Sequence, residues 1–192
     1  MDDETTLIEL TMLQGLWSAE QYVLLSDQTN RLIEFTDGVL EVLPMPTRYH
    51  QAISRFLFLL LLPVVQRIGG TVFYAPLRLQ IRPGKYREPD LLALLNSDDP
   101  RNQDAFWLGA DLVIEIDSPD DPHRDTDVKR LDYAEAGIPE YWIVNPANDT
   151  VTVLQLQDDR YIEHGIFHRG KTATSWLLSD LAVPVTAVFD VR

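Results

Sequence analysis

The sequence predicts a mixed α/β fold, with a mixed central β-sheet flanked by helices, and three observations lead to this class. A long apolar helical pattern occupies residues 48–68, short strand patterns lie on both sides of it, and a strand, a helix and a strand follow one another between residues 112 and 144. The last arrangement fits a crossover between parallel strands, whereas the earlier strands look like antiparallel neighbours. We therefore expect strands of both directions in one sheet.

Local sequence signals define most of the expected helices and strands. Ser18 opens a capping box for a short helix, and Asp37-Gly38 is the turn of a hairpin. Thr47 caps the long helix, which should kink at Pro63 and end at Gly69-Gly70. Strands are expected at residues 32–35, 39–43, 71–74, 77–81, 89–95, 112–117, 140–144, 150–156 and 160–166.

Pro83-Gly84 is the expected turn between the fourth and fifth of these strands. A helix should open at Asp121-Pro122, carry Lys129 and stop at Gly137. The strand at residues 112–117 is apolar with acids inside it, which is typical of a central strand interrupted for chemistry.

Composition favours one globular domain. The chain has 192 residues, of which 45% are hydrophobic and 24% charged, and we expect an N-terminal extension at residues 1–17 followed by one domain at 18–192. There is no cysteine, so disulfides and zinc sites of the cysteine type are excluded. The N-terminus is acidic, unlike a signal peptide, and the longest apolar run, residues 56–65, is too short to span a membrane. We expect a cytoplasmic protein.

Charge is unevenly distributed along the chain. The net charge of −14 argues against nucleic-acid binding over the whole surface. Residues 42–87, however, hold seven cations and no acid, and residues 88–127 hold twelve acids against two arginines. A basic stretch followed at once by an acidic one suits a phosphate-facing surface beside a metal site. Two solvated faces that segregate by chance are the alternative.

Three carboxylates occur at or inside apolar strands. Asp90 starts one strand, and Glu115 and Asp117 lie within another, where an ionised carboxylate is costly unless it is compensated. Strand alternation puts Glu115 and Asp117 on one face, and Asp90 on a neighbouring strand could converge with them on Mg²⁺, which could activate water for phosphoester hydrolysis. Alternatively, Asp90 caps a turn and Glu115 pairs with an arginine such as Arg78 or Arg82.

The ordered set of residues resembles the Uma-two family of restriction-endonuclease-like proteins, within the PD-(D/E)XK nuclease superfamily. The resemblance covers roughly residues 18–189 and implies a restriction-endonuclease-like core and a Mg²⁺-dependent or Mn²⁺-dependent endonuclease activity on DNA. We also expect a homodimer, since two cuts in duplex DNA call for two sites related by symmetry. It is carried by Glu34, Gly38, His50, Pro89-Asp90, Glu115, Ser118-Pro119, Lys129, Tyr133, Gly137 and Glu140-Tyr141-Trp142.

One position departs from the superfamily pattern. The motif has a lysine two residues after the acidic strand residue, where this chain has Asp117. The resemblance implies that the lysine has moved to Lys129, whose ammonium could stabilise charge in the same pocket. The alternative is a helical ion pair between Lys129 and Asp125. Asp117 either adds a third metal-binding carboxylate or binds Lys129.

Two further residues enter through the resemblance. Glu34 is expected to bind the metal or a metal-bound water, or else to be a solvated acid of the hairpin. His50 is expected to be a general base or a phosphate contact, or else a partly buried residue at a helix start. Tyr133 is a plausible neighbour of the site, and Tyr141 and Trp142 are expected in the core.

Three functions follow from these residues. The leading hypothesis is a DNA endonuclease whose Arg48, Arg55 or residues 78–87 contact DNA. The net charge and the missing lysine at position 117 instead favour a non-catalytic binding or regulatory protein of nuclease fold. Hydrolysis of a small phosphoester is the third hypothesis, and it predicts weak DNA binding that salt does not affect.

Overall fold

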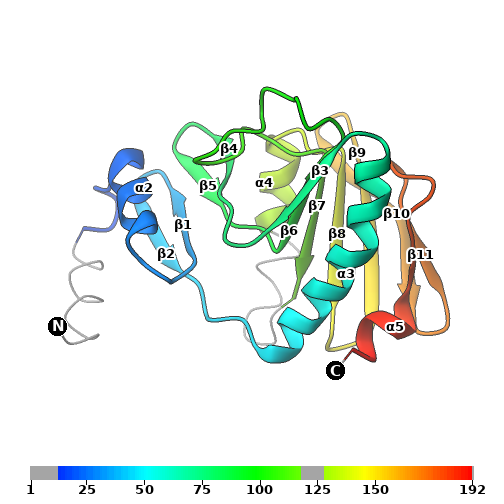
Figure 1. The fold of residues 1–192 in the computed structure, drawn as a ribbon. Coiled ribbons are helices and arrows are strands. Elements are labelled where there is room, and N and C mark those ends of the chain that lie inside the picture. Colours follow the sequence, from blue (N-terminus) through cyan, green and yellow to red (C-terminus); the bar gives the residue numbers. More distant parts are fainter. Residues whose placement is uncertain (1–12, 118–127, 192) are drawn as a thin grey trace.

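The computed structural model describes residues 13–117 and 128–191, and in this part of the chain it contains a six-stranded mixed sheet (Figure 1). The sheet has the order β10-β9-β8-β7-β6-β3. Only β7 and β8 run parallel, and every other neighbouring pair in it is antiparallel. The predicted class and the predicted crossover are therefore confirmed. The strands are β3 (Thr71–Tyr74), β6 (Leu91–Leu94), β7 (Leu112–Ile116), β8 (Glu140–Asn145), β9 (Thr150–Gln157) and β10 (Arg160–His168).

A second, antiparallel sheet was not expected. Its order is β2-β1-β5-β4, and its strands are β1 (Ile33–Thr36), β2 (Val39–Val42), β4 (Leu79–Arg82) and β5 (Lys85–Arg87). The turn at Pro83-Gly84 leads into β5, so the prediction that it joins β4 to the strand beginning near Pro89 was wrong. The sequence of β5, Lys-Tyr-Arg, is short and mostly charged, and therefore lacks a strand signal. A small third sheet pairs β11 (Thr172–Thr174) with β12 (Ala182–Pro184).

Two of the described helices begin at the caps that the sequence predicts. In α2 (Ala19–Asp27) the capping box is present, because Ser18 and Gln21 each accept a hydrogen bond from the other's backbone N–H, at 3.1 and 2.8 Å. Thr47 caps α3 (Arg48–Arg67), whose interior includes Pro63. The others are α4 (Lys129–Glu135) and α5 (Val185–Phe189). The predicted helix start at Asp121-Pro122 lies outside the described residues. None of the described helices is long and apolar enough to cross a membrane.

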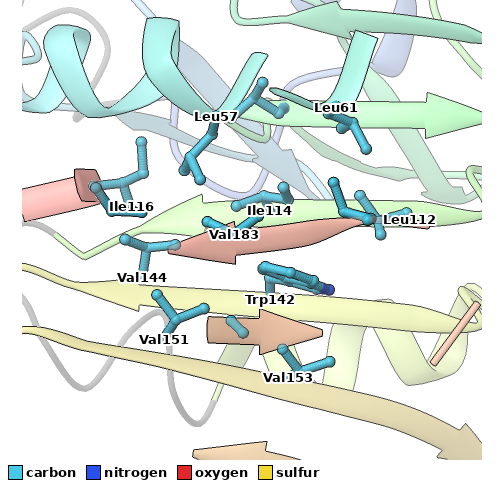
Figure 2. Packing of buried hydrophobic residues seen from close by; sticks show 14 of the residues in the cluster. Leu57, Leu61, Leu112, Ile114, Ile116, Trp142, Val144, Val151, Val153 and Val183 are labelled. Carbon is cyan, nitrogen blue, oxygen red and sulfur yellow. The ribbon is translucent and has the colours of Figure 1, made fainter. Parts of the chain in front are cut away.

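Alternate residues of the strands build two cores on opposite faces of the main sheet. Figure 2 shows Leu57 and Leu61 of α3 over Leu112, Ile114 and Ile116 of β7. On the other face, the side of α4, the core contains these residues among others: Leu92, Val113, Tyr133, Tyr141 and Ile143. Since Ile114 and Ile116 face α3, Glu115 and Asp117 share the face that α4 covers.

The hairpin of β1 and β2 has its own small core. Tyr22 of α2 stacks on Phe35 with 5.2 Å between the ring centroids. Part of the expected N-terminal extension also joins this unit. The side chain of Gln14 exchanges two hydrogen bonds of 2.7 Å with the backbone of Leu40. This unit brings β1, and with it Glu34, against β5.

One buried acid serves the fold. Glu140 is fully buried on β8, where it accepts hydrogen bonds from the Trp142 indole at 2.6 Å, the Ser175 hydroxyl at 2.6 Å and the Leu177 N–H at 2.7 Å. These neutral donors tie the chain before β12 to the main sheet. Tyr141 and Trp142 are also fully buried, which confirms that they are core residues.

Candidate active site

Glu115 is a buried acid whose charge is met by the helix that covers it. Its side chain on β7 is 3% exposed, and its Oε1 lies 2.9 Å from Nζ of Lys129. The Tyr133 hydroxyl donates a hydrogen bond to the same oxygen. Burial, together with the charge of Glu115, raises the pKa of Tyr133 well above its ordinary value, so this hydroxyl remains a donor.

Helical spacing explains why Lys129 and Tyr133 act together. The two residues are four positions apart on α4, so they share the face that packs against β7. The arginines proposed as alternative partners of Glu115 are engaged elsewhere: Arg78 with Asp27 at 2.6 Å and Arg82 with Asp37 at 2.7 Å. That alternative was wrong. Asp125, the other proposed partner of Lys129, lies outside the described residues.

Asp90 lies beside Glu115 because of strand register. Leu92 pairs with Val113 and Leu91 with Ile114, so Asp90, the residue just before β6, lies next to the part of β7 that carries Glu115. The Asp90 Oδ2 accepts a hydrogen bond from the backbone N–H of Ile116 at 2.8 Å. Asp90 is thus bound to the neighbouring strand, and the prediction that it caps a local turn was wrong.

His50 reaches the same carboxylate from the first turn of α3. Its Nε2 lies 3.1 Å from Oδ2 of Asp90, and its backbone N–H donates to the capping hydroxyl of Thr47. Burial alone would lower the pKa of His50, but the hydrogen bond and charge of Asp90, with the charge of Glu115, raise it above its usual value. His50 is therefore a partly buried residue at a helix start and also a neighbour of the carboxylates.

Glu34 approaches the cluster from the smaller sheet. Its side chain is 1% exposed, and its Oε1 lies 4.0 Å from Nζ of Lys129. Its Oε2 lies 3.5 Å from Nε of Arg87. The alternative of a solvated hairpin acid was wrong. Lys129 therefore lies between acids of two different sheets.

Asp117 is buried at the end of β7, where its Oδ2 accepts a hydrogen bond of 2.7 Å from the Asn145 amide. Among the described residues, no three histidine, aspartate or glutamate side chains are grouped so that they could hold a metal ion. The predicted ligation of one metal ion by Asp90, Glu115 and Asp117 therefore stays a prediction. A Mg²⁺ ion needs only one or two carboxylates besides water and phosphate, and the neighbouring Asp90 and Glu115 fit that requirement.

The cations of residues 78–87 all form ion pairs with acids, and the prediction that this stretch contacts DNA stays a prediction. Arg87 is 7% exposed and Asp132 of α4 is 4% exposed. Two nitrogens of Arg87, Nε and NH2, lie 2.8 and 2.7 Å from Oδ2 of Asp132, and Nζ of Lys85 lies 2.7 Å from Oδ1. Sequence reasoning did not single out Arg87 or Asp132. The available signal was weak: alternate cations in β5, and acids three residues apart in α4.

The comparisons with known proteins agree with this fold. The model of the Uma2 family, described as "Putative restriction endonuclease", matches residues 19–186. A solved structure from Anabaena variabilis, described as "a putative nuclease belonging to DUF820", is similar with a TM-score of 0.69 and 24% sequence identity, over 82% of this chain and 89% of that chain. No curated protein matches.

The two findings carry different weight. The structural likeness shows the fold, a mixed α/β core whose central mixed sheet is flanked by helices. The family match covers most of the chain, confirms the resemblance found in the sequence and supports a nuclease-like function. The chain therefore belongs to the Uma2 family.

Proposed function

We propose that this protein is a Mg²⁺-dependent endodeoxyribonuclease, able to use Mn²⁺, that hydrolyses phosphodiester bonds of DNA as a homodimer in the cytoplasm. The proposal rests on one observation, which is that two neighbouring acids and a lysine, the groups that nuclease chemistry needs, lie together. Asp90 lies just before β6, next to the part of β7 that carries Glu115, and a lysine ammonium lies 2.9 Å from Glu115 although position 117 has no lysine. The dimer follows from the symmetry of two cuts in duplex DNA.

Asp90 and Glu115 are the residues that would hold the ion, with Asp117 as a candidate for further ligation. Their oxygens suit a hard cation, and the Asp90 side chain is 15% exposed, so solvent reaches it. When bound, Mg²⁺ polarises a phosphoryl oxygen and lowers the pKa of a coordinated water.

The other side chains of the site would bind and orient. Lys129 places a positive charge where negative charge develops on the phosphoryl group, and Glu34 helps to hold that ammonium. Tyr133 fixes the rotamer of Glu115 through its hydroxyl. His50 holds Asp90 through Nε2, and its roles as a general base or a phosphate contact both stay proposals.

DNA would approach along the N-terminal half of α3. Arg48 and Arg55 are exposed on this helix, and neither forms an ion pair with any described residue. They are seven residues apart, which places them on one helix face, and His50 lies in the same first turn as Arg48. Such arginines suit the phosphates of a duplex that lies over Asp90.

Cleavage of supercoiled plasmid tests the proposal. We expect nicking in Mg²⁺ or Mn²⁺ by the native protein, none with EDTA, and a loss of at least roughly 100-fold in Asp90→Ala, since even residues behind a metal ligand change activity 10-fold to 100-fold. Asp111→Asn is the matched control, because Asp111 is an ion-paired acid just before β7. A native protein that neither nicks DNA nor binds Mg²⁺ or Mn²⁺ by calorimetry contradicts the proposal.

A non-catalytic DNA-binding protein is the second candidate. It is favoured by the way Lys129 and Tyr133 both contact Oε1 of Glu115, which gives the buried charge an internal partner. This alternative predicts DNA binding that EDTA does not change and no cleavage. A hydrolase of small phosphoesters predicts metal binding and DNA affinity that is weak and insensitive to salt.

A further inference from the structure

A line of alternating charges runs behind the candidate site. It links acids and cations of β5, α4, β1 and β7 in the order Lys85, Asp132, Arg87, Glu34, Lys129 and Glu115. The successive separations are 2.7, 2.7, 3.5, 4.0 and 2.9 Å. Each of these side chains is at most 13% exposed, so solvent screens the attractions weakly.

Arg87 is the junction of this line. Besides Asp132 and Glu34, it donates to the Thr36 hydroxyl at 3.0 Å and to the carbonyl oxygens of Phe35 at 3.4 Å and Tyr86 at 3.0 Å. Its planar guanidinium, with five N–H donors, can bridge two elements at once. Arg87 therefore joins β1, which carries Glu34, to α4, which carries Lys129.

Asp132 anchors α4 at the turn that enters the site. It lies three residues after Lys129 and one before Tyr133, and two cations, Lys85 and Arg87, bind its carboxylate. The ion pairs of Asp132 give α4 a fixed point next to Lys129 and Tyr133.

We propose that Arg87 and Asp132 are positioning residues of the candidate site. Arg87 holds Glu34 directly and α4 through Asp132, and this arrangement keeps the Lys129 ammonium between Glu34 and Glu115. The kinetic test below rests on the proposed nuclease function, whereas the spectroscopic test does not.

The kinetic test uses Asp132→Asn, which keeps the shape of the side chain and removes its charge. We expect kcat for DNA cleavage to fall roughly 10-fold to 100-fold, because small misplacements of a catalytic group are that costly, while KM changes little. In the Lys129→Ala background the same substitution should have no further effect. Asp111→Asn, which removes an ion pair with Arg101 near the opposite end of β7, should leave kcat unchanged.

The spectroscopic test exploits the three lysines of the chain, Lys85, Lys129 and Lys171. Lysine labelled with carbon-13 at Cε gives one signal for each, and Lys129→Arg identifies the signal of Lys129. Asp132→Asn should move the signals of Lys85 and Lys129. Glu135→Gln should move only that of Lys85, because Glu135 binds Lys85 at 2.8 Å from the exposed side of α4.

Each outcome decides the question. A Lys129 signal that stays in place in Asp132→Asn overturns the proposal, and so does a kinetic effect that is fully additive with Lys129→Ala. If Asp132→Asn does not fold, Arg87→Lys replaces it; this variant keeps the charge but loses the planar fork, and it should move the Lys129 signal as well. If the native protein cleaves no DNA, the proposed function fails and the lysine signals alone decide on the positioning role.

Discussion

At the scale of single residues, the central fact is a buried carboxylate that the protein supplies with its own cation. Glu115 is enclosed by β7 and α4, and Lys129 and Tyr133 both bind its Oε1. A buried pair of this kind contributes little net stability, but removing one partner leaves an uncompensated charge in a site of low dielectric constant. The site is therefore sensitive to changes in charge more than to changes in size.

We predict that Lys129→Met lowers the free energy of unfolding by about 3 to 5 kcal/mol, which is the usual cost of breaking a buried ion pair. The double variant Lys129→Met/Glu115→Gln should recover most of this loss, because position 115 no longer carries an uncompensated charge. Urea denaturation of the four proteins of this cycle measures both effects. A double variant as unstable as Lys129→Met would show that lost packing, and not the uncompensated charge of Glu115, causes the loss of stability.

At the scale of elements, turns bring the site residues into place. The hairpin turn at Asp37-Gly38 holds β1, and hence Glu34, against β5. Gly38 has a φ of +88°, and a β-carbon on it would lie 2.6 Å from the carbonyl oxygen of Gly15. Both the backbone conformation and the close approach of the N-terminal segment thus require glycine at this position.

Gly38→Ala should therefore destabilise the protein more than Gly69→Ala. Gly69, just beyond the C-cap residue of α3, has a similar φ of +85°, but a β-carbon on it would have no neighbouring atom within 4 Å. Alanine there meets only the backbone preference of about 1 to 2 kcal/mol. The difference between the two variants in thermal unfolding measures the contact with Gly15. If both variants lose the same stability, the segment around Gly15 moves to accommodate the methyl group without a loss of free energy.

At the scale of the whole molecule, the structure separates two groups of cations within the basic stretch of residues 42–87. The four cations of residues 78–87 pair with acids of α2, the hairpin and α4, and so hold the smaller sheet to the rest of the molecule. Arg48 and Arg55 remain on the surface of α3, away from those pairs. An acidic protein can thus keep a locally basic surface, which is where we propose that DNA binds.

Replacement of Arg48 and Arg55 by glutamine should weaken DNA binding for all sequences alike. The slope of log affinity against log salt concentration should decrease by about 1 for each arginine, because each phosphate contact releases counterions. Arg67→Gln is the control, since Arg67 lies at the other end of α3 and pairs with Asp180 at 3.3 Å. Fluorescence anisotropy across a salt series checks this, and an unchanged slope in the double variant would place DNA elsewhere.

The sequence by itself determined the elements whose signals are local. A serine cap, an Asp-Gly turn, a helical apolar period and an apolar strand with acids inside it predicted α2, the hairpin, α3 and β7, because each signal acts within a few residues. The same signals, with the family resemblance, singled out Asp90 and Glu115. Strand alternation also put Glu115 and Asp117 on one face before any tertiary contact was known.

Only the tertiary structure decided how the charges are paired. Arg87 and Asp132 are 45 positions apart, and Lys129 of α4 meets Glu34 of β1, so no local pattern could predict these contacts. The ion pairs of residues 78–87 and the short charged strand β5 were missed for the same reason. A charged residue has a similar local signature whether it faces solvent or a buried partner, and packing alone distinguishes the two.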